Sequence, residues 1–112
     1  MAIANTLVNN IDTTLLTVPA GKRYAITNIL VCNNESINPI HEEAGLTNFD
    51  MHFIKSGDPK SVANMVLRSC PVPAGETFTF DSEKIILEEG DAVVLLGESP
   101  TNLSATISWM EV

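Results

Sequence analysis

The chain has 112 residues, enough for one domain that buries roughly two-thirds of the surface its unfolded form would expose. Apolar residues make up 45% of it, and no run approaches the roughly 18 apolar residues of a membrane-spanning helix. Fourteen acidic against six basic side chains give a net charge of −8, and the only adjacent basic pair is Lys22-Arg23, so neither nucleic acid nor a membrane is expected as a partner.

The first twelve residues contain a single charge, Asp12, among aliphatic, small and asparagine residues. This stretch lacks the basic and apolar segments of a secretory signal, which predicts a protein that stays in the cytoplasm where it is made. Two structures fit residues 1–12: an extended arm that reaches a neighbouring molecule, or the first strand of the protein's own sheet. The sequence leaves both open.

The next segments predict strands separated by a long loop. Residues 13–18 form a β-branched and leucine run that ends in a Val-Pro-Ala-Gly turn. Residues 22–32 follow as a strand with Tyr24 and Ile26 on one face and an irregularity expected near Asn28, where the alternation breaks. Residues 33–48 have no sustained periodicity and include Pro39 and Gly45, which predicts a long loop of the kind that often carries function.

Six further strands are predicted from residue 49 onward. Residues 49–53 alternate between apolar and polar side chains, and residues 62–68 fit either a strand or a short helical turn, of which we favour the strand. Residues 77–80, 84–87 and 92–96 are short apolar or alternating runs divided by turns, the last of them at Gly90-Asp91. Residues 103–109 alternate strictly and give the clearest strand.

Val-Pro-Ala-Gly occurs at residues 18–21 and again at residues 72–75, each time before a strand with an aromatic residue near its start. About eight short strands with turn signals between them and no amphipathic helix predict an all-β fold. We expect a single jelly-roll-like, two-sheet β-sandwich over residues 13–112. Its predicted core consists of the large apolar members of the alternating sets: Tyr24, Ile26, Phe49, Met51, Phe53, Phe78, Phe80, Val94, Ile107 and Trp109.

A metal site is the sharpest enzymatic hypothesis, because histidines and carboxylates are common ligands on cupin-type jelly rolls. The candidate ligands are His41, Glu42, Glu43, Asp50 and His52. Their spacing argues against a site, because the cupin pattern requires two histidines two residues apart near a glutamate, whereas His41 lies in a loop. We expect a polar loop followed by a solvent-facing His52, and neither a metal nor a cofactor.

The other reactive residues give no clearer signal. Cys32 and Cys70 have no CxxC spacing and no nucleophile context, and are expected as two buried thiols. The carboxylates between residues 81 and 91 lack the order of a calcium-binding loop, so a solvated turn surface is expected. The residues therefore predict no catalytic site, and the chain is expected not to be an enzyme.

Three segments together resemble a group of small all-β proteins encoded among bacteriophage virion genes, including those of marine cyanophages. They are TVPAGKRYAITNILVCNN at residues 17–34, PVPAGETFTFDSEKIILEEGDAVVLL at residues 71–96 and NLSATISWMEV at residues 102–112. The shared features are the Val-Pro-Ala-Gly-Lys turn before a strand that ends in Cys32-Asn33, the Ala-Gly-x-Thr turn, the Gly-Asp turn and the final Glu-Val.

This resemblance implies a structural role and no catalytic residue. The expected function is that of a capsid decoration or cement protein, or of a tail or fibre component, located in the virion after assembly in the host cytoplasm. The expected partners are the major capsid or tail protein and further copies of the chain. The candidate contact residues are the apolar residues of the N-terminal stretch and of the long loop: Ile3, Leu7, Val8, Ile11, Ile37, Pro39, Ile40 and Leu46.

Overall fold

A computed structural model describes residues 2–37, 40, 45–81, 85–99 and 102–112. Its strands, in chain order, are β1 (Ala2–Val8), β2 (Thr13–Thr17), β3 (Arg23–Asn33), β4 (Thr47–Ile54), β5 (Met65–Val72), β6 (Thr77–Phe80), β7 (Ile85–Glu88), β8 (Ala92–Gly97) and β9 (Leu103–Glu111). One 3-10 turn, η1 (Val62–Asn64), precedes β5. None of the helical structure in the described ranges is long and apolar enough to cross a membrane.

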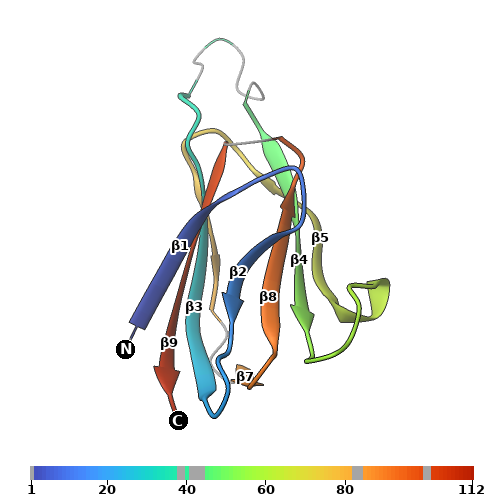
Figure 1. Cartoon of the computed structure of the whole chain (residues 1–112). Helices are drawn as coiled ribbons and strands as arrows, with labels where there is room; N and C mark the ends of the chain where they lie inside the picture. Colours follow the sequence, from blue (N-terminus) through green and yellow to red (C-terminus); the bar gives the residue numbers. More distant parts are fainter. Residues whose placement is uncertain (1, 38–39, 41–44, 82–84, 100–101) are drawn as a thin grey trace.

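The strands form two antiparallel sheets, confirming the predicted all-β sandwich (Figure 1). Sheet A has the order β1-β9-β3-β6, with β7 also paired to β3, and sheet B has the order β2-β8-β4-β5. β6 pairs with the end of β3, and β7 pairs with its beginning, so the two act as one interrupted strand. Counted in this way there are eight strands, and their order is that of a jelly roll with two Greek keys.

The two Val-Pro-Ala-Gly turns occupy equivalent places in this topology. The first leads from β2 in sheet B to β3 in sheet A, and the second leads from β5 in sheet B to β6 in sheet A. In each turn the residue after glycine donates its N–H to the proline carbonyl, at 3.2 Å for Lys22 and 3.1 Å for Glu76. Gly21 and Gly75 both have φ of +76°, a left-handed conformation that glycine adopts without strain. The sequence repeat therefore marks a repeated crossing between the sheets.

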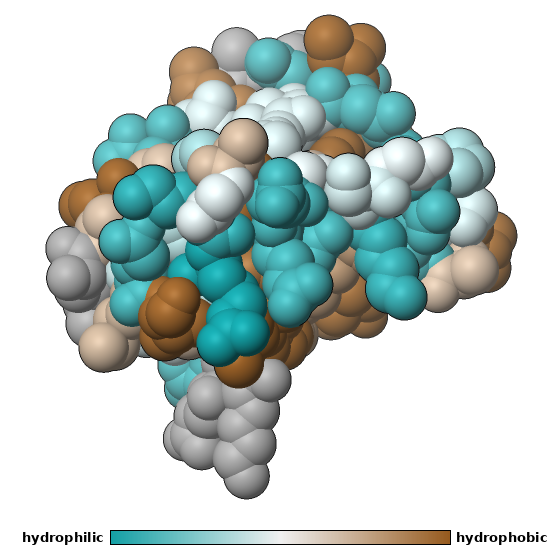
Figure 2. Space-filling view, turned by 60° about the horizontal axis from the view of Figure 1, so that its bottom comes forward, coloured by the Kyte–Doolittle hydropathy of each residue, from teal (hydrophilic) through white to brown (hydrophobic). Residues whose placement is uncertain are grey.

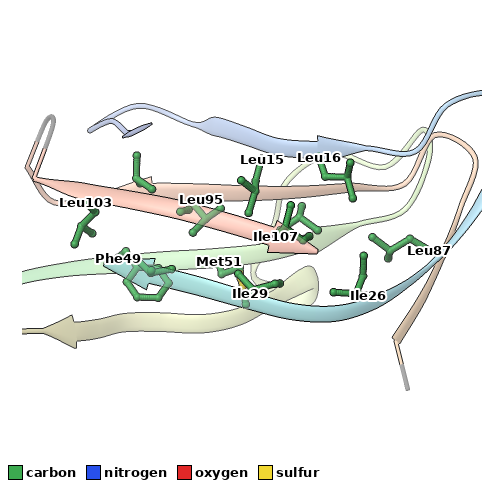
Figure 3. Close-up of a cluster of buried hydrophobic side chains, with 14 of the residues drawn as sticks. Leu15, Leu16, Ile26, Ile29, Phe49, Met51, Leu87, Leu95, Leu103 and Ile107 are labelled. Carbon is green, nitrogen blue, oxygen red and sulfur yellow. The ribbon is translucent and has the colours of Figure 1, made fainter. Parts of the chain in front are cut away.

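Aliphatic side chains from both sheets fill the space between them (Figure 3). Of the ten predicted core residues, Ile26, Phe49, Met51 and Ile107 are in this cluster, and five aromatic residues pack against it while half-buried: Tyr24, Phe53, Phe78, Phe80 and Trp109. Phe49 and Phe78 meet edge to face across the sheets, with their ring centroids 5.7 Å apart. The tenth, Val94, is buried but is not part of the central cluster.

Residues 2–8 form a strand of the protein's own sheet. All seven residues of β1 pair with β9, from Ala2 opposite Trp109 to Val8 opposite Leu103. With β6 and β7 counted separately, β1 brings the total to nine strands, one more than the eight that the sequence predicts. It lies at one margin of sheet A (Figure 1). The irregularity predicted near Asn28 is confirmed by a register shift between Ile26 and Asn28. Residues 62–68 contain both predicted alternatives, the 3-10 turn followed by the strand.

The outer face of sheet B is covered in part by the connection between β4 and β5. Lys60 in this connection forms an ion pair with Asp12, which precedes β2. Because β8 lies between β2 and β4, the Lys60 side chain reaches across the outer face of the sheet. Val94 and His52 lie opposite each other on β8 and β4 and are 8% and 1% exposed. They form a small buried layer outside the main core.

Candidate functional site

Most of the predicted contact residues are exposed to solvent. On the N-terminal side Ile3, Leu7 and Ile11 are 65%, 46% and 67% exposed. In the long loop Ile37, Ile40 and Leu46 are 70%, 82% and 38% exposed. Aliphatic side chains this exposed do not stabilise the fold by burial, so both groups are available for a contact with another molecule.

The prediction for Val8 is wrong. Val8 is fully buried and belongs to the main core cluster, because the period of two along β1 turns it to the inside of the sandwich while Ile3 and Leu7 point outward. Pro39 lies outside the described residues. The contact surface thus reduces to Ile3, Leu7 and Ile11 near β1 and to Ile37, Ile40 and Leu46 in the loop.

Asn33, at the end of β3, fixes the base of the long loop. Its side chain is buried, and its Nδ2 donates to the carbonyls of Gly45, at 2.7 Å, and Val72, at 2.8 Å. Its Oδ1 accepts the N–H of Glu35 at 2.9 Å. One amide therefore joins both ends of the loop to β5. This role of Asn33 is not among those predicted from the sequence, although an asparagine where an apolar run meets a polar loop is a known signal for such a turn.

Ile37 lies against the second Val-Pro-Ala-Gly turn. A Cβ placed on Gly75 would come within 2.9 Å of Ile37 Cγ1, closer than carbon atoms normally approach. The Gly75 N–H also donates to the carbonyl of Asn33 at 3.2 Å. The exposed Ile37 side chain is therefore seated on a turn that hydrogen bonds connect to the loop base, and Asn33 and Gly45, which flank the loop, lie at one end of the sandwich (Figure 1).

The structure separates the candidate metal ligands that it describes. Asp50 Oδ1 accepts the N–H of Ser69 at 2.7 Å and so supports a residue with φ of +48°. His52 is 1% exposed, which makes the expectation of a solvent-facing side chain wrong. His41, Glu42 and Glu43 lie outside the described residues. Within the described ranges, no three histidine, cysteine or acidic side chains gather as a metal site would require.

His52 is held as a neutral imidazole. Burial lowers its pKa from the ordinary 6.5, and the ammonium group of Lys60 lowers it further, while Asp50 and Asp12 oppose this shift. Its Nδ1 is buried without a hydrogen-bond partner among the described atoms. His52 is therefore a packing residue of the outer layer of sheet B.

The carboxylate of Asp91 stabilises a turn. Its Oδ1 accepts the N–H of Ser56 at 2.9 Å, and its Oδ2 accepts the N–H of Glu88 at 2.9 Å. Both carboxylate oxygens of Asp91 thus accept backbone hydrogen bonds that stabilise the turn. Hydrophilic residues cover much of the face of the molecule seen in Figure 2, with hydrophobic patches between and beside them.

The two cysteines are free thiols. Both are half-buried, whereas the sequence predicts two buried thiols. Cys32 lies on the outer face of sheet A, opposite Thr77 and Ser104, while Cys70 packs against the core. Burial raises the pKa of the Cys70 thiol, which keeps it protonated and a poor nucleophile.

A shallow depression near the chain ends contains stacked aromatic rings. Tyr24 and Trp109 stack with ring centroids 5.1 Å apart and planes inclined by 21°. Beside them Lys22 Nζ lies 2.7 Å from Glu111 Oε1 and the bond to this carboxylate raises the pKa of Lys22. Both partners are about half exposed, and the ion pair closes the end of the sandwich next to Ala2.

The exposed aliphatic residues of β1 and the long loop are thus among the surface features that the fold itself does not require. Comparison of the chain with protein-family models, with curated protein sequences and with solved structures found no significant match in any of the three.

Proposed function

We propose that the chain is a non-enzymatic structural protein of a bacteriophage virion, which binds the capsid surface as a decoration protein. The observation that carries the proposal is the long loop, which is anchored at its base by Asn33 and presents Ile37 and Ile40 to solvent. Exposed aliphatic side chains can enter an apolar depression on a partner, and a loop base that is already fixed reduces the conformational entropy lost on binding.

Two further observations support this proposal. The strand order is that of a jelly roll, an architecture that recurs in viral capsid proteins, although the same fold also serves lectins and enzymes. The turn motifs by which the sequence resembles phage virion proteins, the two Val-Pro-Ala-Gly turns and Gly90-Asp91, all form turns between strands. The resemblance therefore rests on residues that determine the fold.

The proposal is tested by placing charges on the loop. Ile37→Asp with Ile40→Asp should leave the protein folded, because both side chains are mostly exposed, but should reduce the amount retained on purified particles of the phage that encodes it. Val62→Asp with Ile86→Asp is the matched control, since these aliphatic residues are 81% and 53% exposed and lie elsewhere. Equal retention of the two variants would reject the loop as the contact.

The copy number per particle then distinguishes the capsid from the tail. Quantitative mass spectrometry of purified particles should give copies comparable to those of the major capsid protein if the chain decorates the shell. A few copies per particle would place it in the tail or a fibre. Absence of the protein from purified particles would reject a virion role altogether.

A further inference from the structure

The four edge strands of the sandwich differ in how well they are protected against pairing. On sheet B, β2 has five residues and a register shift next to Leu15, while β5 contains Pro71, a left-handed Ser69 and two register shifts. On sheet A, the edge opposite β1 is divided between the four-residue strands β6 and β7. Short strands, bulges and proline are the devices that keep sheet edges from associating.

The fourth edge, β1, has none of these devices. It keeps one register over seven residues, contains neither proline nor a charged residue, and has no paired strand on its outer side in the described part of the chain. Figure 1 shows it at the margin of its sheet. A long regular edge of this kind presents a row of free backbone N–H and C=O groups to another strand.

We infer that this edge is an assembly surface, on which β1 pairs antiparallel with β1 of a second copy of the chain. The charge distribution permits a second copy at this edge, and the sequence of β1 favours one. Two chains of net charge −8 repel each other, so they approach most easily where neither has a charged group. The outer face of sheet A next to β1 meets this condition, since it presents Asn5, Ser104, Thr106, Ser108, Leu30 and Cys32.

The sequence of β1 also suits pairing about a twofold axis. With Asn5 on the axis, Ile3 of each copy lies opposite Leu7 of the second copy, and Asn5 lies opposite its own equivalent. Both aliphatic residues are exposed in the single chain, at 65% and 46%, and each would gain an apolar cross-strand neighbour. The result is an isologous contact that joins the two copies of sheet A into one continuous sheet.

The test is the oligomeric state of the purified chain by sedimentation velocity over a range of concentrations. The wild type should form a dimer that dissociates on dilution. Ile3→Lys with Leu7→Lys places two pairs of like charges opposite each other in the dimer and should give a folded monomer. Val62→Lys with Ile86→Lys makes the same change in net charge away from β1 and should remain dimeric.

A wild type that stays monomeric at every concentration overturns the inference. The edge of β1 would then be available only to a strand of a different protein. A dimer that survives the β1 substitutions overturns it as well. If the β1 variant fails to fold, crosslinking decides. In a background with serine at both native cysteines, Asn5→Cys should be joined across the twofold axis by a short thiol crosslinker, and Ile11→Cys, which is also exposed but lies outside the strand, should not. Equal crosslinking of the two rejects the pairing.

The inference concerns the isolated chain and does not depend on the virion role proposed above. The loop substitutions act on particle binding, whereas the β1 substitutions act on self-association. Either proposal can therefore fail while the other stands.

Discussion

At the scale of single residues, two buried polar side chains serve opposite purposes. Asn33 satisfies both its amide nitrogen and its amide oxygen with backbone groups, and so turns a loop base into a fixed structure. His52 is also buried, yet its Nδ1 has no hydrogen-bond partner among the described atoms. A buried polar group without a partner costs free energy, so the outer layer around His52 is a weaker part of the fold than the loop base.

His52 makes the stability of the fold depend on pH. Its pKa in the folded state lies below the ordinary 6.5 of the unfolded chain, because burial and Lys60 disfavour the charged form. The unfolded state therefore binds the proton more readily, and the contribution of His52 is complete above pH 6.5 and lost as the pH falls through the lower, folded-state pKa. Urea unfolding of the wild type should show this loss.

The variant His52→Gln isolates the effect. The difference in unfolding free energy between the wild type and the variant should shrink as the pH falls below 6.5, because only the wild type has the imidazole to protonate. A pH profile of His52→Gln parallel to that of the wild type would show that the imidazole does not titrate differently in the folded state.

At the scale of elements, the two Val-Pro-Ala-Gly turns have the same backbone conformation at glycine but different surroundings. Gly21 and Gly75 have the same φ, so alanine at either position should lose about 1–2 kcal/mol to backbone strain. A Cβ at residue 21 would meet no atom within 4 Å, whereas at residue 75 it would displace Ile37. Gly75→Ala should therefore destabilise the protein more than Gly21→Ala, as measured by chemical denaturation.

A double-mutant cycle tests the cause of this difference. In an Ile37→Ala background the cost of Gly75→Ala should fall to that of Gly21→Ala, because the clash is removed and only the strain remains. The cost of Gly21→Ala should not change in this background. If Ile37→Ala alters both costs equally, the contact between Ile37 and the second turn is not the source of the difference.

Local patterns in the sequence predict those features of each element that depend only on residues nearby in the chain, such as the buried face of a strand or the position of a turn. Ile107, within the strict alternation of residues 103–109, is fully buried as predicted, and the glycines after Pro-Ala form the predicted turns. Where a segment distant in the chain determines whether a side chain is buried, the local pattern gives the wrong prediction. His52 lies on the predicted outer face of β4, but Lys60 extends over that face to Asp12, which no local periodicity records.

The candidate contact surface likewise has one part that the sequence predicts and one part that it leaves open. The sequence identifies the exposed aliphatic residues of the loop because they lack periodicity and burial partners nearby. It could not decide whether residues 1–12 form an arm or a strand, since both require apolar residues at alternate positions. The pairing of β1 with β9, a partner about a hundred residues away in the chain, decides it and also buries Val8.

At the scale of the whole molecule, the balance of charge should limit stability. The chain has fourteen acidic and six basic side chains. The described residues form two ion pairs, Lys22 with Glu111 and Lys60 with Asp12. The molecule measures 51 × 28 × 20 Å along its principal axes. At about 10 mM salt the screening length is about 30 Å, so most carboxylates repel one another across the fold, whereas at about 150 mM it is about 8 Å and only neighbours interact.

Raising the salt concentration over this range should therefore raise the Tm by a few degrees, measured by thermal unfolding at one protein concentration and at neutral pH. Glu89→Lys is the informative variant, because Glu89 is exposed and the change lowers the net charge from −8 to −6. It should be more stable than the wild type at low salt and respond less to added salt, since less repulsion remains to be screened. A Tm that falls with salt would mean that the two ion pairs outweigh the excess of carboxylates, and would also weaken the argument that charge directs a second copy to the uncharged edge of β1.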